Sequence, residues 1–415
     1  MSTADILLYG ASGFTGQLVA EALATQAAWQ KFTWAAGGRN RQKLEERMKE
    51  VNVEPKAYLV ADSMDEEGLR RIVKQVKVVI TVVGPYLQYG EPLVKVCAEE
   101  GVHLVDLTGE TPFMSRTVQR YSHQAQQSKA LILHACGFDS VPSDLGTLLA
   151  VQRLQKLGPD VYAGKVRSGF KARGGFSGGT FMSLIGILES ENSAEVKSAF
   201  KRYSLSPAKG EHSGAPVVVG SARFKGKRTY GMAFLMAPIN CAVVERTWGI
   251  LESADASKRA LRYGPKFVYD EFMTLPNPIV AFLGSAFFYL AFGALLLPPV
   301  RWLAKRFGLK SGDGPPRDAQ QKGWYEVTTY ATSEDGTKEV KVVGKGKGDP
   351  GYLATSWLIS SCALCLLKDY DRLPTIAKDG GFLTPALALG NVLVERLEKT
   401  GRFSWTVEDN QDKDK

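Results

Sequence analysis

The sequence predicts an α/β protein with a doubly wound, Rossmann-type parallel sheet domain and a second α+β domain with an antiparallel sheet. Three observations predict this fold. Short β-branched runs alternate with helical stretches over residues 1–146, a glycine-rich turn follows the first run, and a hairpin pattern surrounds Asp335-Gly336. Parallel strands need crossovers, which are right-handed, so helices are expected on both faces of the first sheet.

The dinucleotide-binding domain is expected to occupy residues 1–146. Its apolar strands are predicted at 6–9, 32–36, 57–60, 78–83, 103–106 and 130–134. Between the strands, leucine and valine recur at spacings of three and four residues, which predicts helices over 16–28, 41–50, 65–74 and 92–100.

A substrate domain is expected over residues 147–349 and a C-terminal helical part over 350–407. Strands of the substrate domain are predicted at 165–171, 217–219, 241–248, 324–332 and 337–344. The composition of 310–322 predicts a flexible linker. The C-terminal helices, 353–367 and 384–397, are expected to pack back on the first domain, and the charged residues 408–415 to form a disordered tail.

The composition is that of an ordinary folded protein, with 415 residues of which 44% are hydrophobic. The net charge of +9 is spread thinly and excludes only a strongly acidic binding protein. No nucleic-acid partner is expected. Five cysteines cannot all pair, and Cys362 and Cys365 have no matching Cys or His pair, so neither a disulfide framework nor a metal site is expected. The first residues lead directly into a strand, so no signal peptide is expected.

The first βα turn has the sequence Gly10-Ala-Ser-Gly13-Phe-Thr-Gly16, directly before a helix. Glycines at this place permit a tight turn, a close approach of backbone N–H groups to a diphosphate, and close packing of the helix on the sheet. The alternative is a turn that only packs the helix. The residues predicted to bind the cofactor here are Gly10, Ser12, Gly13, Phe14, Thr15 and Gly16.

The end of the second strand predicts NADPH in preference to NADH. A site for NAD usually has a carboxylate about 20 residues after the glycines, whereas this strand is followed by Arg39, Asn40 and Lys43. The planar guanidinium of Arg39 suits a 2′-phosphate, and Lys43 adds a charge one helical turn later. The alternative, a solvated helix face, is accepted for Arg41. Asp62 is predicted to bind the adenine amino group, with an N-cap role for Asp62 or Ser63 as the alternative.

The carboxyl ends of the later strands are expected to surround the nicotinamide. Gly84 permits close approach of the backbone and Pro85 stiffens the loop, although a plain strand-to-helix turn is the alternative. Asp106, Glu110 and Asp139 follow neighbouring strands. General acid catalysis, substrate positioning and helix capping remain open for each of these three carboxyl groups.

Several motifs together resemble the saccharopine dehydrogenase-like oxidoreductases, the group that also contains the trans-acting enoyl reductases of polyketide-lipid synthesis. They are GASGFTG, GGRN, VVGPYLQYGEPLVKVCAEEGVHLVDLTGE and CGFDSVPSDLG, and the resemblance continues through 174–180, 348–356 and 380–385. It covers nearly the whole chain. It implies an NAD(P)-binding domain, a second α+β domain and a reductase activity, but it does not imply saccharopine as the substrate.

The proton donor and the substrate contacts are less strongly indicated. No tyrosine has a lysine four residues later, which excludes the Tyr-x-x-x-Lys pair of classical short-chain dehydrogenases. Tyr86, after Gly84-Pro85, is the predicted catalytic proton donor, with water as the alternative. The glycine-dense stretch 173–180 predicts Ser177 and Thr180 as donors to the substrate, with a flexible connection as the alternative.

Residues 279–297 form an uncharged apolar segment, bounded by Pro276 and Pro278 before it and by two prolines after it. Its length just spans a bilayer, and a basic cluster follows, made up of Arg301, Lys305, Arg306 and Lys310. A single span would separate the two domains, so a shallow helical hairpin or a monotopic anchor, broken near Gly284 or Gly293, is preferred. A buried core helix or a dimer helix is the alternative.

These observations predict an NADPH-dependent reductase at the cytosolic face of a membrane or lipid droplet. It would transfer hydride to an activated C=C, C=N or C=O bond of a hydrophobic, lipid-like or polyketide-like substrate. The alternative is a catalytically silent nucleotide-binding protein associated with a membrane or a lipid droplet. A homodimer is left open.

Overall fold

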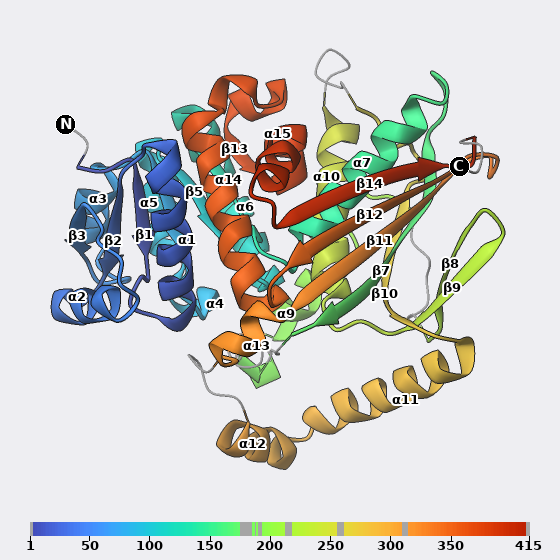
Figure 1. Cartoon of the computed structure of the whole chain (residues 1–415), viewed down its shortest axis with the longest axis horizontal. Coiled ribbons are helices and arrows are strands. Elements are labelled where there is room, and N and C mark those ends of the chain that lie inside the picture. The colour runs from blue at the N-terminus through green and yellow to red at the C-terminus, as the bar shows by residue number, and fades with distance from the viewer. Residues whose placement is uncertain are drawn as a thin grey trace.

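The computed structural model describes residues 3–174, 185–186, 188–189, 193–211, 218–254, 261–308 and 314–411. Two seven-stranded sheets, A and B, form the body of the protein within these residues (Figure 1). Six strands of sheet A come from residues 6–133 and the seventh from the C-terminal part, whereas sheet B is built from residues 163–409; helices of the C-terminal part lie between the two sheets. The predicted combination of a Rossmann-type sheet with a second α+β unit is confirmed.

All strands of sheet A are parallel. Their order is β13 (Gly381–Leu383), β6 (Leu131–Leu133), β5 (His103–Asp106), β4 (Val78–Thr81), β1 (Ile6–Tyr9), β2 (Trp34–Gly38) and β3 (Ala57–Val60). The strands β1 and β4 are buried along their whole length, as expected for strands covered by helices on both faces. The chain order reverses between β1 and β4, and ligands of such sheets bind at the carboxyl ends beside this point.

The helices of the first domain connect these strands. They are α1 (Phe14–Gln30), α2 (Arg41–Glu50), α3 (Glu66–Val73), α4 (Tyr86–Tyr89), α5 (Glu91–Glu100), α6 (Thr111–Ser128) and α7 (Val141–Gln155). The last of them, α7, leaves sheet A and packs against β11 and β12 of sheet B. The residues that follow β6 therefore lie between the two sheets.

The C-terminal part of the chain returns to sheet A. The strand β13 pairs with β6, which the sequence analysis did not predict. The π-helical turn η2 (Pro350–Ala354) leads into α14 (Thr355–Lys368), which contacts α1, β4 and β5. Although its hydropathy would permit a membrane span, 83% of its apolar window is buried inside the protein. The helix α15 (Pro385–Lys399) packs on α7 and α14.

Sheet B is mixed rather than wholly antiparallel, because β10 runs parallel to β7. Its order is β14 (Phe403–Asp409), β12 (Glu339–Lys347), β11 (Trp324–Ser333), β7 (Ala163–Arg173), β10 (Val268–Leu275), β9 (Lys227–Met232) and β8 (Gly220–Phe224). The predicted hairpin is present as β11 and β12. The remaining short elements are α9 (Ser193–Ala199), α13 (Arg317–Gln321), η3 (Tyr370–Arg372) and η4 (Thr375–Asp379).

The predicted strand over 241–248 is wrong, because these residues lie in the helix α10 (Ala237–Ser253). The run is rich in Val, Thr and Trp and therefore resembles a strand. Its buried apolar residues Cys241, Val244, Trp248 and Leu251 recur at helical spacing, however, and they face the core.

Three other predictions at the margins of elements differ from the structure. The strand predicted at 217–219 begins at Gly220, and residue 217 lies outside the described residues. The predicted linker over 310–322 includes the helix α13, which Arg317 fastens to Glu21 of α1 through two hydrogen bonds. The predicted tail starts too early, because β14 extends to the buried Asp409, which pairs with Arg153.

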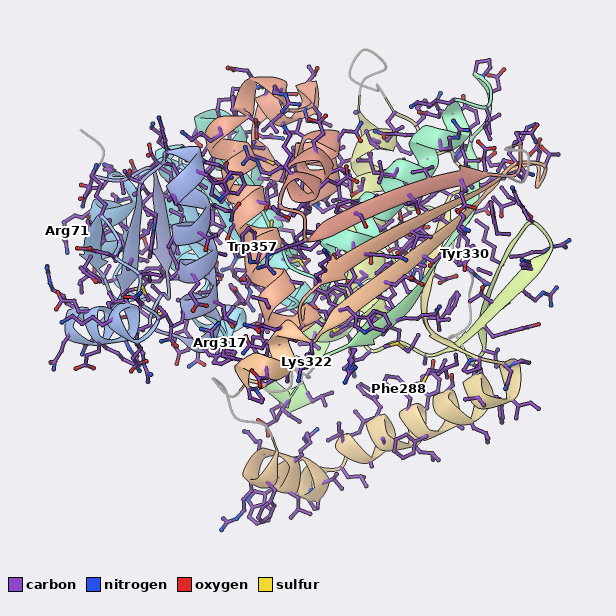
Figure 2. All side chains as sticks on the ribbon, viewed as in Figure 1. Arg71, Phe288, Arg317, Lys322, Tyr330 and Trp357 are labelled. Atoms are coloured by element: carbon purple, nitrogen blue, oxygen red, sulfur yellow. The ribbon has the colours of Figure 1, made fainter. Side chains whose placement is uncertain are left out.

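The apolar segment forms one continuous helix, α11 (Pro278–Leu295), on the outside of the body (Figures 1 and 2). Asn277 caps its first turn by accepting a hydrogen bond from Val280 N at 2.9 Å. The predicted break at Gly284 or Gly293 is wrong; the chain bends only before the next helix, α12 (Pro298–Phe307). Gly284 packs closely on β9, because an added Cβ would lie 2.8 Å from the sulfur of the flexible Met232 side chain.

Candidate active site

The glycine-rich turn connects β1 to α1 at the switch point of sheet A. Gly10 has a φ of +95°, and its N–H donates to Gly37 O of β2 at 2.9 Å. At Gly16, an added Cβ would lie 2.2 Å from Gly10 O, so only glycine lets the helix approach the strand this closely. Around the exposed Gly13, an added Cβ would meet nothing nearer than 3.5 Å within the protein. The open space beside the turn therefore begins at Gly13.

The N-terminus of α1 faces this space. Gly13 is the N-cap residue and supplies no side-chain hydrogen bond to the first turn. The N–H groups of the first turn of a helix have no intrahelical partners, and together with the helix dipole they favour an anion. Ser12, Phe14 and Thr15 are partly exposed at the same turn. The arrangement fits the diphosphate of a dinucleotide cofactor.

A phosphate on the adenosine ribose would meet positive charge at the end of β2. Arg39 and Lys43 are exposed there, and no carboxylate occupies the place that an NAD site would use. The Asn40 side chain accepts from Lys43 N at 2.9 Å and caps α2, so its amide oxygen is already used by the helix.

Asp62 lies beside Arg39 at the ends of β3 and β2. The buried Tyr9 phenol lies near both charges and donates to Ala61 O at 3.0 Å. Burial raises the pKa of Tyr9, the Asp62 carboxylate raises it further, and Arg39 lowers it. Neither Asp62 nor Ser63 is the N-cap of α3, a role that belongs to Asp65; Asp62 instead accepts from Met64 N within its own loop.

The loop after β4 borders the glycine-rich turn. A Cβ on Gly10 would lie 2.8 Å from the Val83 side chain, so the two loops are in direct contact. Gly84, the next residue, is exposed, and Pro85 is partly exposed. Gly84 and Pro85 therefore lie beside the glycine-rich turn, just after the carboxyl end of β4.

Tyr86 is buried beneath this loop. Its hydroxyl donates to Thr81 O at 3.2 Å and accepts from Leu107 N at 3.2 Å, so it bridges the ends of β4 and β5. Burial raises the pKa of Tyr86 well above its usual value, and the nearby Asp106 carboxylate adds to this effect. The single phenolic proton is committed to a backbone carbonyl inside the protein, which argues against the prediction that Tyr86 protonates the substrate.

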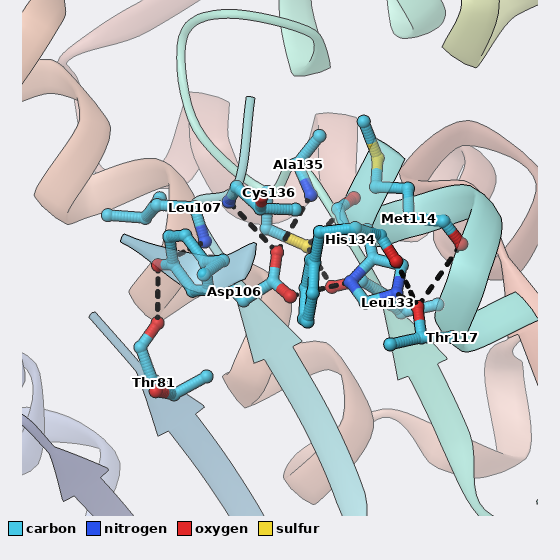
Figure 3. A network of polar contacts seen from close by, with 12 residues as sticks. Thr81, Asp106, Leu107, Met114, Thr117, Leu133, His134, Ala135 and Cys136 are labelled. Carbon is cyan, nitrogen blue, oxygen red and sulfur yellow. Dashed lines mark hydrogen bonds and ion pairs between the residues drawn. The ribbon is translucent and has the colours of Figure 1, made fainter. Parts of the chain in front are cut away.

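Asp106 belongs to a buried polar network with His134 and Thr117 (Figure 3). One carboxylate oxygen accepts from the N–H groups of Thr108 and Ala135, at 3.0 and 3.1 Å, and the other lies 2.5 Å from His134 Nδ1. His134 Nε2 lies 2.9 Å from the Thr117 hydroxyl. Together, these contacts of Asp106 and His134 hold the ends of β5 and β6 against α6. The sequence analysis did not single out His134; its only signal was a histidine at the end of an apolar strand.

Glu110 follows β5 and Asp139 follows β6, and the two carboxyl groups differ in their hydrogen-bond partners. The Glu110 carboxylate accepts from Tyr86 N at 3.0 Å and from Leu87 N at 2.7 Å, so it caps α4. Asp139 is partly exposed, and the described part of the chain provides no hydrogen bond or ion pair for its carboxyl group. Burial raises the pKa of Asp139 to about 6. The three carboxyl groups that the sequence analysis left equivalent thus have different surroundings.

The two remaining predictions concern the substrate and metals. Ser177 and Thr180 lie outside the described residues. Among the residues that the structure does describe, no group of three or more His, Cys, Asp or Glu side chains could hold a metal ion.

Known proteins resemble this chain over its whole length. The model of the saccharopine dehydrogenase NADP binding domain matches residues 6–133. A Mycobacterium tuberculosis (H37Rv) protein, provisionally named a trans-acting enoyl reductase, is 36% identical over 96% of each chain. A Mycobacterium bovis (BCG) protein named trans-acting enoyl reductase is 31% identical over 96% of each chain. A Caenorhabditis elegans protein named lipid droplet localized protein is 29% identical over 94% of this chain and 95% of its own.

A solved structure supports the same fold. Apo saccharopine dehydrogenase (L-Glu forming) from Saccharomyces cerevisiae covers 98% of this chain and 99% of its own, with a TM-score of 0.53 at 12% identity. The glycine cradle and the open helix N-terminus fit the cofactor that the domain model names. The chain therefore belongs to the saccharopine dehydrogenase-like family that includes the trans-acting enoyl reductases, and it is an NAD(P)-dependent oxidoreductase with NADP(H) as its cofactor.

Proposed function

We propose that this protein uses NADPH to reduce an activated carbon–carbon double bond in a lipid-like substrate held at a lipid surface. The names of its relatives support the type of bond and the lipid setting. The observation that carries the proposal is α11, an apolar helix that the described residues leave largely uncovered. Only 11% of its apolar window is buried, whereas the value for α14 is 83%.

The outer surface of α11 consists of large apolar side chains. Phe287 and Leu290 are each 74% exposed, and Ile279 is 71% exposed. An apolar surface of this extent is unusual on a protein that contacts only water, and it marks an interaction site. The opposite side of the helix packs on β9, where Ser285 Oγ accepts from Ala233 N at 2.9 Å. A lipid surface is the occupant that best fits a long, uncharged and continuous helix.

The connections of α11 favour an orientation in the plane of the lipid surface. The helix follows β10, and the chain re-enters sheet B at β11; both strands pair with β7. The strands before and after the α11–α12 segment therefore belong to the same sheet. A single crossing of a bilayer would place these two strands on opposite sides of the membrane, which their shared pairing with β7 does not allow. The segment instead supports a monotopic anchor.

The basic residues after α11 are partly engaged within the protein. Lys305 pairs with Glu189 at 2.6 Å, and Arg301 donates to the carbonyls of Leu188 and Leu296. Arg306 lies over the rings of Trp302 and Phe307, both of which are exposed. Aromatic and basic side chains together suit the headgroup region of a membrane, with Arg306 as the main contact to anionic lipid. Lys310 lies outside the described residues.

A row of aromatic rings connects the anchor with the carboxyl ends of sheet A. Phe234, next to Ala233, stacks on Phe170 of β7 with 4.5 Å between ring centroids. Phe170 in turn packs against Phe138 after β6, at 6.0 Å. The segment after β9, which contacts α11, and the loop next to Asp139 therefore share one apolar region, which suits a substrate with a hydrophobic tail.

In this proposal, the cofactor and the protein residues have separate roles. Bound NADPH supplies a hydride. The amides at the start of α1 hold its diphosphate, Arg39 recognises the 2′-phosphate, and Gly84 leaves space for the backbone to approach the cofactor. The aromatic residues after β6 and in sheet B exclude water from the reacting carbons.

The proposal is tested by NADPH consumption with a panel of lipid substrates that carry enoyl, imine or carbonyl groups. We expect oxidation of NADPH with enoyl thioesters, measured by the loss of absorbance of the reduced nicotinamide and by the mass of the product. A competing function, favoured by the name of the Caenorhabditis elegans relative, is a silent nucleotide-binding protein of lipid droplets. Tight NADPH binding without turnover of any member of the panel would support that function instead.

The anchor is tested by Leu283→Glu combined with Phe287→Glu and Leu290→Glu. These side chains are already in water, so we expect the melting temperature to stay close to that of the wild type, while binding to vesicles of phosphatidylcholine and phosphatidylserine falls by more than about tenfold. Binding is measured by sedimentation with the vesicles.

The control for the anchor is Trp29→Glu with Met64→Glu, at two exposed apolar positions away from α11, which should leave vesicle binding intact. If the α11 variant retains vesicle binding, the anchor is refuted. If it instead converts a dimer into a monomer, the helix contacts a second copy of the chain and not lipid.

A further inference from the structure

We infer that Asp139 is the proton donor of the reaction, the residue that completes the reduction after hydride transfer. The inference rests on the proposed function and names a catalytic residue for it. Asp139 lies in the loop between β6 and α7, at the carboxyl edge of the parallel sheet.

Several contacts place this loop between the two sheets. Cys136 N donates to Asp106 O at 2.8 Å, which holds the loop next to the end of β5. Phe138 N donates to the Thr355 hydroxyl at 3.0 Å. The Phe138 ring packs against Phe170 and Tyr325 of sheet B, with centroids 6.0 and 4.7 Å apart. Asp139, the next residue, therefore lies in a loop held between the carboxyl edge of sheet A, where the nicotinamide is expected, and the aromatic residues of sheet B.

Five other polar side chains at this edge are engaged within the protein. Asp106 and His134 bind each other, Glu110 caps α4, and the Tyr86 proton is donated to Thr81 O. The buried Cys136 thiol donates to Leu133 O. Helix capping does not explain Asp139 either, because Ser140 is the N-cap residue of α7 and its hydroxyl donates to Asn240 Oδ1.

The electrostatic surroundings of Asp139 are simple. The titratable groups on the elements around it are Asp106 and His134 at the strand ends, Cys136 in the same loop, Asp144 in α7, Tyr325 behind Phe138, and Glu271, which is reached through Ser140 and Asn240. None of them contributes to the shift, since burial alone raises the pKa of Asp139 to about 6. A carboxyl group with a pKa near neutral is well matched to general acid catalysis.

Reduction of the double bond needs one hydride and one proton. Hydride, with its two electrons, forms a C–H bond at the carbon β to the carbonyl of an enoyl substrate, and the π electrons of the double bond move to give an enolate. The O–H bond of the Asp139 carboxyl group breaks as a second C–H bond forms at the α carbon. NADPH becomes NADP⁺, and the Asp139 carboxylate regains its proton from water.

The test compares Asp139→Asn with the wild type, using an enoyl thioester that the wild type reduces. Asparagine keeps the size of the side chain but has no acidic proton. We expect kcat to fall by at least about 100-fold, while NADPH affinity, measured by nicotinamide fluorescence, stays unchanged. In the wild type, kcat/KM should fall as the pH rises above the pKa of Asp139, because the acid must be protonated; this limb should vanish in the variant. Asp139→Glu should restore part of the rate.

Thermal stability provides a readout that does not depend on turnover. The pKa of Asp139 is raised in the folded protein, so its ionisation opposes folding as the pH rises from about 4 to about 6. Asp139→Asn should therefore melt at a higher temperature than the wild type at pH 7.5, and the difference should disappear near pH 4. Asp144 is the matched control: burial also raises its pKa to about 6, but it accepts from Thr247 and Ala386 N, so Asp144→Asn should melt lower.

The outcomes separate this inference from the proposed function. If the wild type reduces enoyl thioesters and Asp139→Asn keeps its rate and its pH profile, the proton-donor role is overturned and the proposed function stands. If the variant loses NADPH affinity together with its rate, Asp139 belongs to the cofactor site and the inference is also overturned. A wild type that reduces no member of the panel overturns both.

Discussion

Replacing Gly16 by alanine is expected to destabilise the nucleotide-binding domain by about 3 kcal/mol, the upper end of the usual cost of overpacking. The added Cβ would lie 2.2 Å from Gly10 O and 2.8 Å from Ala11 Cα. Both neighbours are backbone atoms of the same turn, so no side chain can move aside to relieve the contact. The free energy of unfolding, measured by chemical denaturation without cofactor, tests this expectation.

Gly13→Ala is the matched variant for this turn. Gly13 has ordinary extended dihedral angles, with φ of −81° and ψ of 166°, and an added Cβ would meet nothing nearer than 3.5 Å. Its stability without cofactor should stay within about 1 kcal/mol of the wild type. NADPH affinity should nevertheless fall by about 100-fold, because the methyl group occupies the approach of the diphosphate to the amides. Unchanged affinity in Gly13→Ala would show that the diphosphate does not bind at this turn.

Arg39→Ala is expected to lower NADPH affinity by about 10- to 100-fold and to leave NADH affinity almost unchanged. A hydrogen bond to a charged group contributes about 1.5 to 3 kcal/mol, and each 1.4 kcal/mol corresponds to a tenfold change in affinity. Only NADPH carries the phosphate that the guanidinium would bind. Titration of nicotinamide fluorescence with each nucleotide measures the two affinities separately.

Arg41→Ala provides the control for Arg39. Arg41 is equally exposed, two residues further along, but it pairs with Glu45 at 2.8 Å and lies over the Tyr58 ring. We expect its removal to change neither affinity by more than about twofold, since exposed ion pairs contribute little. Equal losses of NADPH and NADH affinity in Arg39→Ala would mean that Arg39 does not recognise the 2′-phosphate.

Local sequence patterns were sufficient to predict an element where few structures are compatible with the pattern. The run from Ile6 to Tyr9, followed by three glycines and a helix, predicts the first βα unit, because few other arrangements use such a turn. The absence of an acidic residue from the sequence directly after β2, at 39–43, is visible in the same way. The valine-rich run over 241–248 misled, because burial on a helix next to sheet B outweighs β propensity.

Long-range pairing explains the elements that were missed. The three-residue strand β13 has no pattern of its own and exists because β6 offers it an open edge. The charged end of β14 is stabilised by pairing with β12 and by the ion pair of Asp409 with Arg153. Neither partner is near in the sequence, so composition alone predicted a tail.

The sequence by itself determined the class of cofactor and the parallel sheet that binds it, because glycine spacing, strand order and the cations after β2 are local properties of the chain. It also determined that an uncharged apolar helical segment would be present, but not that this segment forms one continuous helix. Only the tertiary structure decided that the described residues leave α11 largely uncovered while they bury the similarly apolar α14, since burial depends on which surfaces remain after the sheets have packed. The same holds for Asp106, Glu110 and Asp139: they occupy equivalent places in the sequence, and only the donors that folding brings to each carboxyl group distinguish them.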